Sequence, residues 1–313
     1  MTPSYLGRLM LLAGASFFLL QLALGSLIAF VAPAAIRRSG TMRPHRAAGF
    51  LLTLRLLPAA FSAIIVAVLC VPSYLRFEPR FTKEEVGSVC MAAAFSGALL
   101  CAAAIARTFG ALIRSALYIR RCGGVESRVE GEKVWIIPHS AGLALAGILQ
   151  PRLLISADAM RLLTRDQLAV ALRHERAHRA SRDNLKRLLM LLAPRIFPRL
   201  RLLEQEWAKC AEWAADDRAA EGNADRSAAL AEALVRVARL QAGIGMPPLV
   251  TSLVEADEDL SQRVDRLLEA PVYRSDPRAG GIALAAGAIL ICSIAIAPAM
   301  LRIVHQLLER LLD

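Results

Sequence analysis

The sequence predicts a mainly α-helical, polytopic membrane protein with four transmembrane helices and a mainly helical internal domain that contains a small β-sheet. Hydrophobic residues make up 56% of the 313 residues, well above the apolar share of a soluble domain. Mean hydropathy is +0.46. Long apolar stretches with few or no charges lie near both ends of the chain, and about 20 such residues suffice to cross a bilayer as a helix. Between them, a helical pattern dominates after Ser156.

The N-terminal region, residues 1–106, contains the first three predicted spans. They lie at about 9–36, 49–75 and 86–106. The first has no charged residue; a cleaved secretory signal peptide is the alternative, but its apolar core would be only about 7 to 15 residues. The second carries Arg55 near one end, where we expect the side chain to snorkel to the membrane interface.

Arginines in the short loops predict the orientation. The loop after the first span, RRSGTMRPHR, carries four arginines and no acid, whereas RFEPRFTKEE, between the second and third spans, has three basic and three acidic residues. The positive-inside rule therefore puts the N-terminus outside and residues 107–278 in the cytoplasm. The fourth span, 279–301, is uncharged, and we expect the tail at 302–313 to be too short for an outer domain.

The basic charge of the chain fits a membrane location. The formal net charge is +11, from 38 lysines and arginines against 27 acids, and the arginines gather at the ends of apolar segments, facing anionic lipid. A DNA-binding membrane regulator is an alternative, but we find no recognition-helix pattern and expect no nucleic acid partner. The six cysteines form no CxxC pair, which argues against a cysteine zinc site or a disulfide framework.

The internal domain opens with a predicted amphipathic helix to Arg121 and a turn-rich stretch, CGGVESRVEGEK. The following segment, VWIIPHSAGLALAGILQPRLLIS, predicts two short strands around glycines. Residues 187–203, apolar with arginines and two prolines, form either a membrane-surface element near the active site or an ordinary packing segment.

A specific signal lies in ALRHERAHRA. Thr164 and Gln167 have the capping-box pattern, so a helix begins there, and His174 and His178 fall one turn apart on one face. At this spacing two imidazoles can bind one Zn²⁺, with Glu175 as the base that deprotonates a zinc-bound water. The alternative is an exposed charged helix in which Glu175 pairs with a neighbouring arginine.

A second helical stretch, CAEWAADDRAAEG, supplies a third ligand. Glu212 offers a carboxylate oxygen, and Asp216, one turn later, can hydrogen-bond the far nitrogen of a zinc-bound histidine. Three protein ligands and an open fourth position are typical of a catalytic zinc site, so we expect one Zn²⁺ per chain.

These motifs resemble the gluzincin membrane metallopeptidases, which combine HExxH with ExxAD, and most closely the BlaR/MecR type; the CAAX-prenyl-protease and HtpX-like families are near neighbours. The resemblance implies that His174, His178 and Glu212 are zinc ligands and that Glu175 is the general base. It implies that Asp216 hydrogen-bonds a zinc-bound histidine without binding the metal itself. It also implies a structural role for Asp183, and a substrate-binding edge strand at about Leu145 to Ser156.

Two features depart from the resemblance. Position 176 is arginine where the family usually has an apolar residue, which affects local packing rather than ligation. We expect no penicillin-binding sensor domain after the fourth span, so β-lactam sensing is not carried over. His139, near the strands, is either structural or a donor to the developing oxyanion.

The sequence therefore predicts a zinc metalloendopeptidase of the bacterial inner membrane. The expected partners are the lipid bilayer and a protein substrate, either a membrane protein or a soluble regulator cleaved in regulatory proteolysis. A catalytically inactive membrane scaffold that keeps the zinc-peptidase fold is the alternative, and a homo-oligomer is compatible with either.

Overall fold

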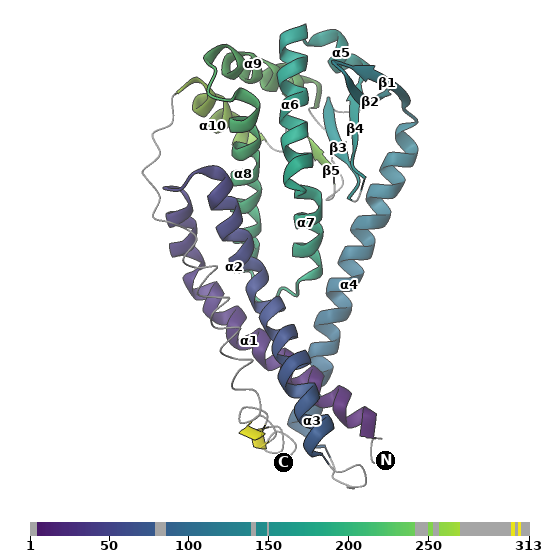
Figure 1. The fold of residues 1–313 in the computed structure, drawn as a ribbon, viewed down its shortest axis with the longest axis vertical. Helices are drawn as coiled ribbons and strands as arrows, with labels where there is room; N and C mark the ends of the chain where they lie inside the picture. Colours follow the sequence, from purple (N-terminus) through teal and green to yellow (C-terminus); the bar gives the residue numbers. More distant parts are fainter. Residues whose placement is uncertain are drawn as a thin grey trace.

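The computed structural model describes residues 5–78, 86–138, 142–148, 150–241, 250–252 and 257–269, together with 302–303 and 306–307. The N-terminal ends of α1 and α4 and the α3 helix lie at one end of the molecule, and the sheet and α5, α9 and α10 lie at the other (Figure 1). The predicted fourth span, 279–301, and His139 fall outside the described residues.

Three helical segments that are long and apolar enough to cross a membrane lie at the first three predicted spans. They comprise α1 (Tyr5–Ser39), then α2 (Pro44–Ile65) continued by a π-helical turn (Val66–Cys70) and α3 (Val71–Phe77), and finally α4 (Ser88–Cys122). The π-helical turn ends two residues before Pro72, which has no N–H to donate to the regular helical hydrogen-bond pattern. The helix α4 runs without a break through the expected end of the third span at 106, so the predicted amphipathic helix to Arg121 is its continuation.

The sheet is larger than the sequence predicted. Its strands are β1 (Val125–Val129), β2 (Glu132–Ile137), β3 (Leu143–Ala146), β4 (Arg152–Ser156) and β5 (Val250–Ser252), in the order β1-β2-β4-β3-β5. Only β2 and β4 pair in parallel; the other neighbouring pairs are antiparallel. The turn-rich stretch forms the β1–β2 hairpin, whose turn residues Glu130 and Gly131 have positive φ, as expected of a tight two-residue turn.

The prediction that Leu145 to Ser156 form an edge strand is wrong. This range contains the end of β3, a connection and all of β4, and β4 lies between β2 and β3. The other side of β3 pairs with β5, from a distant part of the sequence. In the described part of the sheet the edges are therefore β1 and β5.

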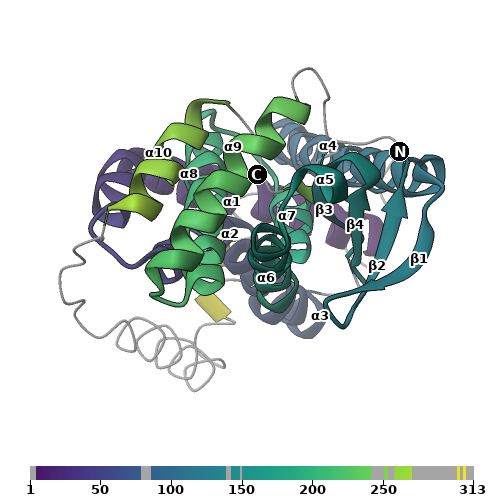
Figure 2. The same ribbon diagram turned by 90° about the horizontal axis from the view of Figure 1, so that it is seen from above.

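Helices follow the fourth strand, as predicted. They are α5 (Ala157–Leu162), α6 (Arg165–Ser181), α7 (Asp183–Leu192), α8 (Arg199–Ala220), α9 (Ala224–Gln241) and α10 (Asp257–Leu268). The main core of this part lies between the sheet, α6 and α9, with Leu145, Ile155, Leu172 and Leu234 buried. Seen from above, α6 lies between the sheet and α8 (Figure 2).

The α8 helix also packs on the spans. Its first half buries Leu200, Leu203 and Trp207 in a cluster with Ala48 and Leu51, and Phe197, just before it, approaches α1. Packing is therefore confirmed for one face of residues 187–203. On the other face Leu189, Leu192 and Leu202 are exposed.

Arg55 does not snorkel. It is 1% exposed, because α7 and α8 cover it: Nε donates to Glu204 Oε1 at 2.7 Å and Nη2 donates to the carbonyls of Met190 and Ala193, each at 3.1 Å. Arg195 binds the other oxygen of Glu204 at 2.9 Å. A buried arginine in α2 thus connects a predicted span to the end of α7 and the first half of α8.

Candidate metal centre

The α6 helix begins at the capping box that the sequence predicted, and its two histidines share one face. The Oγ1 of Thr164 accepts the backbone N–H of Gln167 at 3.3 Å, and the Oε1 of Gln167 accepts the N–H of Thr164 at 3.1 Å, which completes the capping box. With the start fixed, His174 and His178 point to the same side of the helix, toward α8, and both are fully buried.

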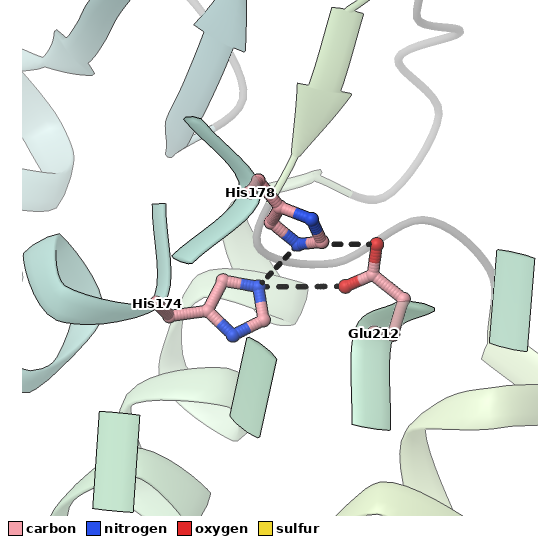
Figure 3. A group of neighbouring side chains, drawn as sticks. All are labelled: His174, His178 and Glu212. Atoms are coloured by element: carbon pink, nitrogen blue, oxygen red, sulfur yellow. Dashed lines mark hydrogen bonds and ion pairs between the residues drawn. The ribbon is translucent and has the colours of Figure 1, made fainter. Parts of the chain in front are cut away.

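Three ligand atoms converge in this space (Figure 3). The Nε2 atoms of His174 and His178 lie 3.0 Å apart, and each lies 3.4 Å from an oxygen of Glu212. Zinc bonds of about 2.0–2.1 Å in a tetrahedron place neighbouring ligand atoms about 3.3 Å apart. The three side chains therefore fit one tetrahedral metal ion with little movement.

The charges of the pocket favour a cation. Burial opposes the protonated form of His178, but Glu212 and Asp183 outweigh burial and raise its pKa to about 10. Burial likewise opposes protonation of His174, and Asp216 and Glu212 outweigh it, so this pKa is raised as well. A metal-bound imidazole must be neutral, so a bound metal ion would take the place of these protons.

Each histidine has a carboxylate at its other nitrogen. Asp216 Oδ1 lies 2.9 Å from Nδ1 of His174, and Asp183 Oδ2 lies 2.8 Å from Nδ1 of His178. Lys186 donates to the second oxygen of Asp183 at 2.8 Å. Such partners orient an imidazole and present its Nε2 lone pair to a metal.

Glu175 faces the interior. It is fully buried, and neither carboxylate oxygen has a hydrogen-bond partner among the residues that the structure describes. Burial raises its pKa to about 7. The charged-helix alternative is therefore wrong for this residue.

The neighbouring arginines pair elsewhere. Arg173 contacts Glu221, while Arg176 and Arg179 both contact Glu132 of β2, at 3.1 and 3.0 Å. The unusual arginine at position 176 therefore joins α6 to the sheet. These side chains are 38–39% exposed, so each pair contributes little stability.

Two arginines that the sequence analysis did not select also reach the site. Arg263 of α10 is buried and contacts both Asp216 and Glu212, and Nη2 of Arg187 in α7 lies 3.8 Å from Glu212 Oε1. A signal for Arg263 exists in the sequence, because it stands between Leu260 and Leu267 on the apolar face of an amphipathic helix.

Asn184 fixes the start of α7 to the sheet. Its Nδ2 donates to the carbonyls of Leu145 and Gly147, at 3.1 and 2.8 Å, at the end of β3. The adjacent residue, Asp183, holds His178. The turn between α6 and α7 therefore sets the positions of His178 and the end of β3 relative to each other.

A family model described as BlaR1 peptidase M56 matches residues 76–267, more than half of the chain. The matched segment includes His174, His178 and Glu212, and begins before the third span. No curated protein matches the sequence.

Proposed function

Since the chain belongs to the BlaR1 peptidase M56 family and is a membrane metallopeptidase, we propose that it is a zinc-dependent endopeptidase that cleaves a protein substrate at the cytoplasmic side of a bacterial inner membrane. The observation that carries this proposal is the buried group of His174, His178 and Glu212, with Glu175 beside it on the same helix. Its donor set, two imidazoles and one carboxylate, suits zinc.

Zinc, when bound, lowers the pKa of a coordinated water to about 7 and polarises a carbonyl. His174, His178 and Glu212 would hold it, with Asp216 and Asp183 orienting the two imidazoles. Glu175 accepts the proton of the attacking water on a carboxylate oxygen and then delivers it to the nitrogen of the leaving amine. Burial without a competing hydrogen bond from a described residue keeps this carboxylate available for both transfers.

The proposed sidedness rests on the arginine-rich loop between the first two spans. His45, in the first turn of α2 directly after that loop, lies close enough to Asp217 and Arg218 of α8 for their charges to act on it. This proximity supports a location of the loop and of the α8 helix on the same side of the bilayer, and positive-inside bias favours the cytoplasm for that side. A protein substrate in regulatory proteolysis, either a membrane protein or a soluble regulator, fits this location.

Replacing the proposed base tests the function. Cells that express the wild type, Glu175→Gln or Glu221→Gln are compared for new protein N-termini, and zinc is measured in each purified protein. Glu221 is a matched control because it is an exposed glutamate that pairs with Arg173 outside the metal pocket. We expect one zinc per chain in all three and loss of cleavage in Glu175→Gln alone, because the amide cannot accept the proton.

Normal cleavage by Glu175→Gln would refute the assignment of the base. A wild-type protein that binds no zinc would instead support the alternative of a catalytically inactive membrane scaffold, because a scaffold with this fold does not need the metal.

A further inference from the structure

Arg263 brings a further helix, α10, to the metal centre. Its Nε donates to Asp216 Oδ2 at 2.8 Å and its Nη2 donates to Oδ1 at 2.7 Å, so the guanidinium binds both oxygens of one carboxylate. Its Nη1 lies 3.3 Å from Glu212 Oε2. The Arg263 side chain is 3% exposed, so these contacts are made away from solvent.

We infer that Arg263 is a positioning residue of the metal centre, which fixes the Asp216 carboxylate against His174 and holds Glu212 toward the two histidines. This inference rests on the proposed zinc site and deepens it. It assigns to α10 a role in metal binding, beyond the packing role that its amphipathic pattern predicts.

The argument begins at Asp216. Its Oδ1 lies between Nη2 of Arg263, at 2.7 Å, and Nδ1 of His174, at 2.9 Å. A carboxylate bound at only one oxygen can rotate, whereas the planar fork of an arginine fixes the plane of both oxygens. With that plane fixed, the carboxylate stays beside Nδ1 of His174, while Nε2 points toward Nε2 of His178 and the carboxylate of Glu212.

Asp216 and Glu212 share this arginine. The guanidinium is the cation that pairs with the fully buried Asp216 carboxylate, at 2.7 and 2.8 Å. Glu212 has a similar neighbour, since Nη1 of Arg263 lies beside the oxygen that approaches His174. The guanidinium of Arg263 therefore contacts both Glu212, a proposed metal ligand, and Asp216, the carboxylate beside His174.

The charge and the shape of Arg263 act in opposite directions on a bound dication. The positive charge repels the metal, whereas the fork orients the groups that bind it. Arg263→Lys separates the two effects, because lysine keeps the charge but has no planar fork. Any weaker zinc binding by this variant is then due to lost orientation.

Arg266 provides a matched control on the same helix. It lies one turn from Arg263, donates to the carbonyl of Trp213 at 3.4 Å, and pairs with Asp217 instead of Asp216. Arg266→Lys therefore perturbs a second arginine contact between α10 and α8. An effect that depends on docking of α10 as a whole would be the same in both variants.

The experiment uses the full chain in detergent micelles. Zinc affinity is measured by competition with a chromophoric chelator, and the cobalt(II)-substituted proteins are compared by visible absorption, which reports ligand geometry. We expect Arg263→Lys to weaken zinc binding about 10-fold and to change the cobalt spectrum, and Arg266→Lys to stay within about twofold of the wild type. Combined with Asp216→Asn, Arg263→Lys should weaken binding by less than the product of the separate effects.

Wild-type affinity and an unchanged cobalt spectrum in Arg263→Lys would overturn the inference, as would an equal loss in Arg266→Lys. These outcomes are distinct from failure of the proposed function, which a wild-type chain that binds no zinc would show.

Discussion

Arg55→Met tests whether the first half of α8 is anchored to the spans by the buried arginine. Methionine retains an unbranched apolar side chain but removes the charge and every donor. The change leaves Glu204 without its 2.7 Å partner and leaves the carbonyls of Met190 and Ala193, at the end of α7, without their donor. All three acceptors lie where two helices meet a predicted span.

The expected loss follows from these contacts. A hydrogen bond to a charged group contributes about 1.5–3 kcal/mol, and removal of one partner of a buried ion pair costs about 3–5 kcal/mol. Glu204 is 21% exposed and keeps Arg195 at 2.9 Å, so the lower end applies. We expect the free energy of unfolding to fall by about 3 kcal/mol, which corresponds to a melting temperature lower by roughly 5–10 °C.

Equilibrium unfolding in mixed detergent micelles, followed by far-UV circular dichroism, measures this loss. Arg195→Met is the control: its side chain is 30% exposed and shares the same glutamate, so its removal should cost about 1 kcal/mol or less. An Arg55→Met protein within about 0.5 kcal/mol of the wild type, or no less stable than Arg195→Met, would refute the anchoring role.

Two further predictions concern helix packing and the metal. At Gly97 an added Cβ would lie 2.6 Å from the carbonyl oxygen of Gly14, so Gly97→Ala must separate α1 from α4 and should cost about 1–3 kcal/mol in the same unfolding assay. Gly49→Ala, where a Cβ meets no described atom within 4 Å, should cost nothing; equal stability of the two variants would contradict this packing. Asp183→Asn should weaken zinc binding about 10-fold in chelator competition, because the amide is a poorer acceptor for His178; unchanged affinity would show that Asp183 does not support the ligand.

The part of the site that the sequence predicted is the part governed by local geometry. The capping box fixes the start of α6, and 3.6 residues per turn then place His174 and His178 on one face. The same period predicts that Glu212 and Asp216 share a face of the next long helix. Hydropathy and length likewise predicted four spans, because bilayer thickness sets the length of an apolar helix, and long apolar helices lie at the first three of them.

Contacts between distant residues were not predictable in this way. Arg55 and Glu204 are a span residue and a helix residue far apart in the chain, and nothing in either local pattern indicates the other. The β1 strand was missed because its outer position leaves it largely exposed, without the apolar alternation that marks a half-buried strand. The edge strand was misassigned because β5, which covers β3, comes from the far side of α9 in the sequence.

The α8 helix connects the candidate metal centre to the predicted spans. Its first half buries Leu203 and Trp207 against α1 and α2, while its second half carries Glu212 and Asp216 toward α6 and α10. A helix transmits rotation or translation along its length, because its backbone hydrogen bonds fix each turn on the next. A shift of α2 relative to α6 would therefore move Glu212 relative to His174 and His178. For this reason we place the contact between Arg55 and Glu204, two turns before Glu212, among the interactions that hold the three candidate metal ligands in position relative to one another.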